Sequence, residues 1–129
     1  MATKVIQPKS LSDPTPRYSQ GILADGGKLL FIAGQTASDK DGNVVGKGDI
    51  EAQTHQVFKN LSAVLTEAGG SLDNLVMTTT YITDRKYREG YNEVRRQQYK
   101  KSPPTSTLVI VKGLANKDYL IEIAGIAVL

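Results

Sequence analysis

A single carboxylate, Glu122, stands in the middle of a strongly apolar segment that runs from Tyr119 to Leu129. The β-branched residues of this segment predict a strand, whose side chains point alternately to opposite faces. A carboxylate among apolar neighbours is costly unless it is paired, hydrogen-bonded or facing a cavity. Glu122 is therefore the first candidate for chemistry, as a general base or a water-orienting group. The alternative is a structural role, as the partner of a buried lysine or of backbone amides at a subunit junction.

The composition removes several classes of site. The chain of 129 residues has no cysteine, which excludes disulfides, thiol catalysis and cysteine-based zinc sites. His55 is the only histidine, so metal sites built on two histidines are excluded as well. Helical spacing places His55 on the flank of an apolar stripe, which favours a surface position over a ligand or a base. We expect no metal and no cofactor.

Charge and hydropathy argue against a nucleic-acid or a membrane partner. The net charge is +3, and the basic residues concentrate between Lys86 and Lys101. Helical spacing makes this segment the solvated face of an amphipathic helix, which we favour over a nucleic-acid patch. No apolar run reaches the length of a membrane span, and the N-terminus lacks the apolar core of a signal peptide. We expect a cytoplasmic protein with no membrane partner.

The elements that must position Glu122 follow from periodicity and turn signals. After an irregular lead-in over the first sixteen residues, strands at 18–23 and 28–33 flank the turn signal Asp25-Gly26-Gly27 and predict a hairpin. Asp49 is a good N-cap for a helix that Gly69-Gly70 ends. A strand at 75–82, a helix capped by Asp84, and strands at 105–111 and 119–129 follow.

One domain, residues 1–129, with the order β-β-α-β-α-β-β and a mixed sheet is therefore predicted, an α+β fold. Two helices cover only one face of such a sheet. The face that carries Glu122 is also apolar, because Leu120, Ala124, Ile126 and Val128 share it. The simplest cover is another copy of the chain, so we predict an oligomer whose sheets pack together.

Several short motifs in one order resemble the Rid family, also called YjgF/YER057c/UK114. The resemblance extends from about Tyr18 to Val128. Its motifs are Tyr18-Ser19-Gln20-Gly21, Ile32-Ala33-Gly34-Gln35, Asn60-Leu61 with Ala68-Gly69, Thr79 to Ile82, the proline before Ser106-Thr107-Leu108-Val109, Leu120 to Ile123, and Ile126 to Val128. The resemblance implies a chorismate-mutase-like fold assembled as a homotrimer, with small-molecule clefts between neighbouring subunits. It also implies hydrolysis of reactive enamines and imines, which releases ammonia and a 2-oxo acid.

The resemblance also assigns site residues. The cleft glutamate falls on Glu122 and the cleft tyrosine on Tyr18, our two catalytic candidates. The turn that binds substrate falls on Ala33, Gly34 and Gln35. Backbone amides near Gly34 would stabilise developing negative charge.

One departure from the family pattern concerns the substrate. Deaminase members carry an arginine shortly after the proline, where it clamps the substrate carboxylate. Here that position falls on Thr105 or Ser106. A hydroxyl of Thr105, Ser106 or Thr107 can hydrogen-bond a substrate, but it cannot replace the charge of an arginine fork. We therefore expect weak activity on standard 2-imino acids.

Two further functions stay open at this point. A non-catalytic trimer that binds a small metabolite, or acts as a regulator or chaperone-like protein, is favoured by the missing arginine. The retained Glu122 and Tyr18 argue against it. A ribonuclease would need a basic groove lined by aromatic residues and an acid-base pair, which two phenylalanines, no tryptophan and one histidine disfavour.

Overall fold

Residues 2–129 are described by a computed structural model, in which one mixed sheet carries two helices on a single face. The sheet has the strand order β3-β6-β4-β5, in which only β4 and β5 are parallel. The elements are β1 (Ala2–Ile6), β2 (Gly21–Asp25), β3 (Leu29–Gln35), α1 (Ile50–Glu67), β4 (Leu75–Ile82), α2 (Arg88–Arg95), β5 (Thr105–Ile110) and β6 (Ile121–Val128). The predicted α+β class and mixed sheet are confirmed.

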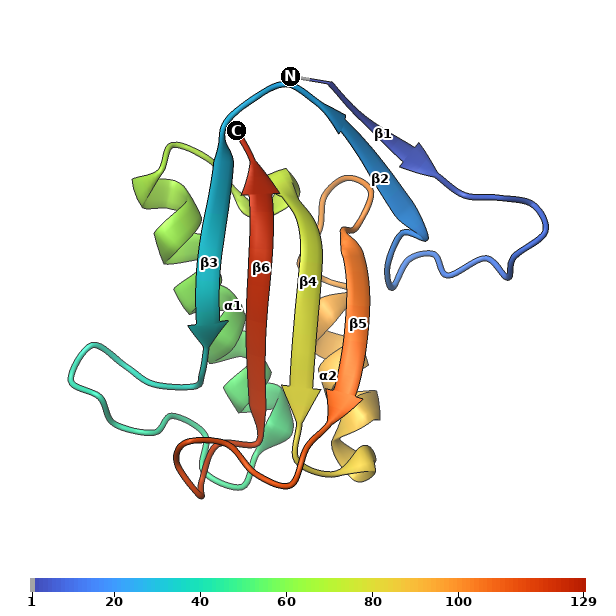
Figure 1. Cartoon of the computed structure of the whole chain (residues 1–129). Helices are drawn as coiled ribbons and strands as arrows, with labels where there is room; N and C mark the ends of the chain where they lie inside the picture. Colours follow the sequence, from blue (N-terminus) through green and yellow to red (C-terminus); the bar gives the residue numbers. More distant parts are fainter. Residues whose placement is uncertain (1) are drawn as a thin grey trace.

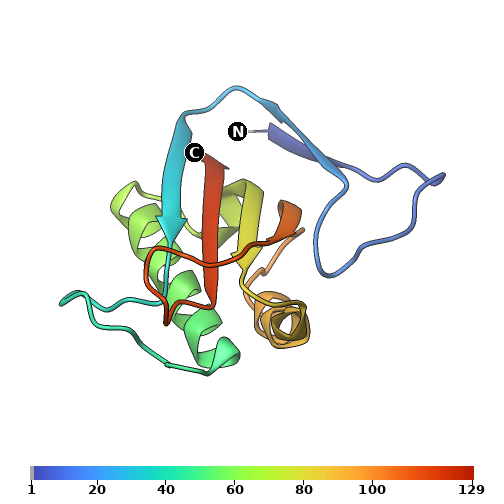
Figure 2. The same cartoon turned by 60° about the horizontal axis from the view of Figure 1, so that its bottom comes forward.

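The core lies between the helices and one face of the sheet (Figures 1 and 2). Asp49 begins α1 as predicted, because its side chain accepts a hydrogen bond from the Ala52 amide at 3.1 Å. Alternate residues of β6 are buried against α1, including Ile121, Ile123 and Ala127. Glu122 consequently points to the opposite face of the sheet, which no helix covers.

The N-terminal region departs from the prediction in two ways. Residues 2–6 form a strand where an irregular lead-in was expected, and they pair with β2 in a separate two-stranded sheet. The predicted hairpin of residues 18–23 with 28–33 is wrong, because β2 and β3 do not pair. Gly26 and Gly27 take positive φ angles of 80° and 91° in the connection. This backbone lets β2 turn away from β3, toward the β5 side of the molecule (Figure 1).

We call residues 2–25 the N-terminal arm. In Figure 2 it extends from the body of the molecule instead of lying in the main sheet. Neither helix of the described part of the chain has the length and apolar character needed to cross a membrane.

Candidate functional site

Glu122 lies half-buried on the uncovered face of the sheet, directly against Gly34. The ladder between β3 and β6 is irregular between Ile32 and Gln35, so Ala33 and Gly34 bulge out of register. A Cβ atom on Gly34 would lie 2.7 Å from Cδ of Glu122. A side chain at this position would displace the carboxylate, which approaches the backbone closely. The structure brings together Glu122, Ala33, Gly34 and Gln35, which we call the glutamate corner.

Tyr81 completes this corner, and sequence reasoning did not include it. It is the register partner of Glu122 on β4, and side chains of paired residues share a face. Within residues 2–129 the Glu122 carboxylate takes part in no ion pair and no side-chain hydrogen bond. The proposed partnership with a buried lysine is therefore not found in a single chain, and the carboxylate is free to bind water.

Two polar side chains of α1 fix the backbone on either side of the glutamate corner. The buried Gln53 accepts a hydrogen bond from the Leu120 amide and donates one to the Asp118 carbonyl, both at 2.8 Å. Asn60 donates to the carbonyls of Thr36 and Ser38 at 2.9 and 3.0 Å. These bonds hold the chain that enters β6 and the chain that leaves β3, so the position of the carboxylate is set by the helix.

The hydroxyls that the sequence predicts for substrate binding lie at the start of β5. Thr105 donates to the Val76 carbonyl at 2.9 Å, and Ser106 accepts a hydrogen bond from the Arg95 guanidinium at 2.9 Å. Thr107 is exposed on the uncovered face. Two of the three hydroxyls are thus already engaged within the chain.

Arg95 is buried, contrary to the prediction from the sequence. The basic segment 86–101 is predicted to be a solvated face, but Arg95 is only 6% exposed. Its guanidinium lies 4.6 Å from the centroid of the Tyr91 ring, and it donates hydrogen bonds to Asn92 and Ser106. Nε of Arg95 is buried without a hydrogen-bond partner. The cation therefore lies beneath Ser106, one of the two positions where the family arginine was expected.

No negative charge balances Arg95 within residues 2–129, since neither ion pair of this region includes it. Burial of its hydroxyl raises the pKa of Tyr99, and Arg95 lowers that pKa only partly. Tyr99 therefore stays neutral and supplies no counter-charge. An uncompensated buried cation favours the binding of an anion.

Tyr18 also lies at this end of the sheet. Its neighbour Ser19 is buried, donates its backbone amide to the Pro104 carbonyl at 3.0 Å, and donates its hydroxyl to the Pro103 carbonyl. Tyr18 itself is half-buried in the loop before β2 and not in a strand as predicted. We call Tyr18, Thr105, Ser106 and Arg95 the serine corner.

The two corners are far apart in one chain. Thr105 pairs with Met77, whereas Glu122 pairs with Tyr81, four residues further along β4. With a rise of about 3.3 Å per residue and about 4.8 Å between strands, Thr105 and Glu122 are on the order of 16 Å apart. One copy of the chain therefore does not bring all the predicted site residues together.

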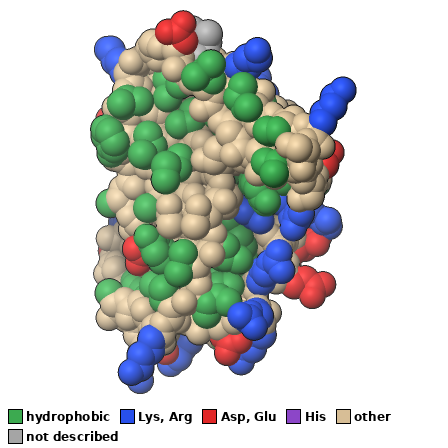
Figure 3. Space-filling model, turned by 45° about the vertical axis from the view of Figure 1, so that its right-hand side comes forward, with side chains coloured by type: hydrophobic (Ala, Val, Ile, Leu, Met, Phe, Trp, Pro, Cys, Tyr) green, Lys and Arg blue, Asp and Glu red, His purple; other side chains and the backbone are tan. Residues whose placement is uncertain are grey.

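The uncovered face between the corners is apolar. Phe31 is 70% exposed, Leu29 is 61% exposed and Met77 is 45% exposed on this face. A hollow of about 210 Å³ lies among Phe31, Met77, Thr79, Ala124 and Ile126. Figure 3 shows hydrophobic side chains over much of the visible surface, with most Lys and Arg side chains at its margins. A face of this kind is typical of a protein–protein interface.

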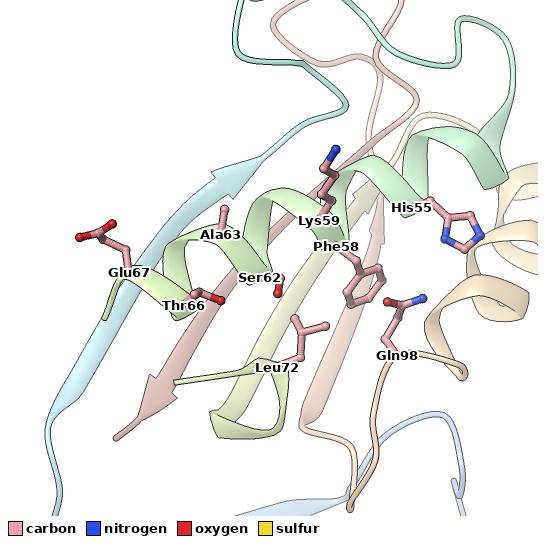
Figure 4. Close-up of a pocket in the computed structure, with 9 residues that line it drawn as sticks. All are labelled: His55, Phe58, Lys59, Ser62, Ala63, Thr66, Glu67, Leu72 and Gln98. Carbon is pink, nitrogen blue, oxygen red and sulfur yellow. The ribbon is translucent and has the colours of Figure 1, made fainter. Parts of the chain in front are cut away.

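A larger groove, of about 740 Å³, lies on the helix side of the molecule (Figure 4). His55, Phe58 and Gln98 gather at one of its ends, and Thr66 and Glu67 lie at the other. Its polar side chains do not converge on one point, and no predicted site residue lines it. In residues 2–129 no group of three or more His, Asp or Glu side chains is arranged to hold a metal ion.

Comparisons with known proteins agree with the fold. The family model described as endoribonuclease L-PSP matches residues 9–129. A RutC family protein of Pyrococcus abyssi is 39% identical over 127 residues, which cover 98% of each chain.

Two solved structures from Yersinia pestis, both of unknown function in the conserved Rid protein family, resemble the whole chain. YyfB is 30% identical, covers 100% of both chains and superposes with a TM-score of 0.91. YyfA is 36% identical, covers 99% of this chain and 100% of its own, and superposes with a TM-score of 0.73.

Proposed function

This chain belongs to the Rid family, the family of the L-PSP model, and we propose that it is a hydrolase that deaminates a small reactive enamine or imine in a cleft between subunits. The observation that carries the proposal is the unpaired Glu122 carboxylate held against the Gly34 backbone. The assembly is a homotrimer, as the family resemblance implies, and the apolar face around Phe31 supports subunit packing.

In the proposed reaction, Glu122 accepts a proton from a water molecule whose oxygen attacks the carbon of the C=N bond. The nitrogen takes up a proton and a carbinolamine forms. Its C–N bond then breaks, ammonia leaves, and the hydroxyl loses its proton to give a carbonyl. An enamine first takes up a proton at carbon to become the imine. Amides of the Ala33–Gly34 bulge, which are out of the ladder register, would stabilise negative charge that develops in the cleft.

The serine corner of a neighbouring subunit would bind the rest of the substrate. Thr105 and Thr107 would present their side chains on the uncovered face, and Arg95, which contacts Ser106 on the helix side of β5, would supply a positive potential to an anionic group. This cation is buried and does not project as a fork, so a carboxylate is bound less tightly than by the arginine of other deaminases. Weak activity on 2-iminopropanoate therefore stays our prediction.

A non-catalytic metabolite-binding trimer is the second candidate. The engaged hydroxyls of Thr105 and Ser106 favour it, because they leave fewer groups to orient a substrate. Glu122 distinguishes the two candidates. A binding protein has no use for the basicity of an unpaired carboxylate, whereas a hydrolase depends on it.

The proposed hydrolase activity is tested by measuring turnover of candidate substrates. Small enamines and imines, including 2-aminoacrylate and 2-iminopropanoate, would be generated in situ, and release of the 2-oxo acid would be followed. We expect acceleration by the wild-type protein and a loss of about 10²-fold or more in Glu122→Gln. The variant should remain a trimer with unchanged thermal stability. Binding of these compounds without acceleration would support the second candidate instead.

A further inference from the structure

Four strand edges lack a partner in the described residues, those of β1, β2, β3 and β5, and among them β2 and β3 follow each other in the chain. β3 lies at the border of the main sheet and pairs only with β6, and β2 pairs only with β1. An open edge presents unpaired backbone donors and acceptors that readily pair with another strand. The edges of β2 and β3 are the two that the predicted hairpin would have joined, and the chain between them holds them apart (Figure 1).

An apolar groove follows the open edge of β3. It has a volume of about 470 Å³ and is lined by Leu30 of β3 and by Ala63, Val64, Glu67 and Ala68 of α1. On the arm, Leu23 of β2 is 61% exposed. A strand added beside β3 would place the side chain opposite Leu30 beside this groove. The arm thus carries an exposed leucine, and the edge of β3 carries a groove that fits one.

A solved structure also supports the position of the arm outside the main sheet. YyfB superposes on the whole chain with a TM-score of 0.91. The arm makes up nearly a fifth of the chain, so a score this high requires that the corresponding segment of YyfB superposes on it as well. YyfA has higher sequence identity but a TM-score of 0.73. We infer that the two Yersinia proteins differ in where a segment of about this size lies.

We propose that the arm of one copy adds to the β3 edge of the next copy, so that subunits exchange arms and each cleft receives Tyr18 from the neighbouring chain. The occupant of the β3 edge is thus a second copy of this chain. In the register that the Asp25–Lys28 turn would set, Leu23 stands opposite Leu30 and Tyr18 opposite Gln35. Domain swapping of this kind keeps the contacts of a closed hairpin and makes them between chains.

The exchange has a consequence for the site. Ser19 ties Tyr18 to Pro103 and Pro104 of its own chain, beside Thr105 and Ser106. An arm that pairs with the neighbour's β3 therefore delivers the whole serine corner of one copy to the glutamate corner of the next. The catalytic role of this composite site rests on the proposed function. The strand exchange itself does not, because it requires no turnover.

Cysteine cross-linking tests the exchange directly, because the natural chain has no cysteine. We would co-express two separately tagged chains, one with Leu23→Cys and one with Leu30→Cys, and oxidise the assembly. We expect a disulfide between the two tags. The double variant Leu23→Cys/Leu30→Cys in one chain should give covalent ladders up to the trimer on a non-reducing gel. The Leu23→Cys chain alone, as the control, should stay monomeric on the gel.

A disulfide within one chain of the double variant, with its mobility shift as a monomer, would overturn the proposal. Absence of any disulfide in a folded assembly would overturn it as well. If the cysteine variants do not fold, the same pairing can be read from Leu23→Asp, which should release the arm. Protection of the Leu29–Gln35 amides from hydrogen exchange should then fall, and unchanged protection would contradict an arm on β3.

The exchange can also be tested by measuring the catalytic rate of mixed trimers. Tyr18→Phe and Glu122→Gln chains would be co-expressed. In an exchanged ring about a quarter of the sites receive both natural residues, so about that share of the wild-type rate should return. If the arm folds back on its own chain, both residues of a site come from one chain and no activity returns. The cross-linking result stands even if no substrate is turned over, which separates failure of this inference from failure of the proposed function.

Discussion

The glutamate corner and the serine corner are opposite in charge and lie differently in the sheet. The first lies on the uncovered face, whereas the second joins Thr105 on that face to Ser106 and Arg95 on the helix side. The glutamate corner holds a half-buried carboxylate that lies against Gly34 and has no charged partner within residues 2–129. The serine corner holds a buried guanidinium that, in the described part of the chain, has no charged partner; it lies over the Tyr91 ring and donates a hydrogen bond to Ser106. Each corner therefore lacks the charge that the other carries, and about 16 Å of sheet separates them in one chain.

This comparison supports the proposal that one copy holds only part of a site. A free carboxylate suits proton transfer, because nothing competes with water for it. A buried cation suits anion binding, because it is shielded from solvent and salt. When the corners of neighbouring copies meet, a small polar substrate can lie between the two charges. The following changes are expected to break or sharpen that arrangement, in order of decreasing effect.

Phe31→Asp should separate the two corners altogether. Phe31 is 70% exposed on the uncovered face, and a carboxylate there would be buried without a partner in an assembled trimer. We expect sedimentation near the 14.0 kDa of one chain and no detectable turnover. Thr66→Asp, an equal charge on the helix side, should remain a trimer. A fully active Phe31→Asp trimer would show that this face is not the interface.

Gly34→Ala should damage the glutamate corner alone. Its Cβ would lie 2.7 Å from Cδ of Glu122, so the carboxylate has to turn away from the bulge. We expect a fall in kcat of about 10²-fold with assembly intact, because the base is displaced. Gly113→Ala is the matched control, since a Cβ there meets nothing within 4 Å. Equal rates for the two variants would remove Gly34 from the site.

Arg95→Met should weaken substrate binding without harming the fold. It removes a buried cation that has no counter-charge within residues 2–129, and the relief of its desolvation cost offsets the loss of its hydrogen bonds to Asn92 and Ser106. We expect KM for an anionic substrate to rise about tenfold, as for a lost charge-assisted hydrogen bond. Thermal stability should be unchanged or higher, and Arg96→Met should change neither quantity. Lower stability with an unchanged KM would assign Arg95 a purely structural role.

Ser106→Arg tests whether an arginine on β5, as in other deaminases, raises the rate on 2-iminopropanoate. Alone it places a second guanidinium beside Arg95, where the two cations repel each other. Combined with Arg95→Met, it moves the cation from the helix to the strand. We expect the double variant to hydrolyse 2-iminopropanoate a few-fold faster than the wild type, and Ser106→Arg alone to gain less. The same rate in all three proteins would show that the cation at this corner does not limit the reaction.

Much of the fold could be predicted because its signals are local. Asp49, the apolar stripe behind it and Gly69 fix α1, and alternation along β6 places Glu122 on the face that the helices leave open. The hairpin prediction failed because the positive φ angles that Gly26 and Gly27 allow fit an open connection as well as a tight turn, and the sequence does not decide between them. The irregular lead-in was wrong because Ala2–Ile6 gains its structure only by pairing with β2.

The site was harder to predict than the fold. Arg95 has the spacing of a solvated residue, and its burial depends on how β5 packs over α2. Tyr81 joins Glu122 only through the register between β4 and β6, which no local pattern specifies. The separation of the two corners is likewise a property of strand order, so the residues that the family resemblance groups together are divided in one chain.

The central claim is that each site combines the glutamate corner of one copy with the serine corner of the next. Its most direct test is the rate of a mixed trimer made by co-expressing Glu122→Gln with Ser106→Glu, in which a new carboxylate blocks Arg95. Each variant alone should be inactive. The mixture should regain about a quarter of the wild-type rate, because that share of sites then joins two intact corners. A mixture as inactive as its parents, with mixed trimers verified by their tags, would contradict a composite site.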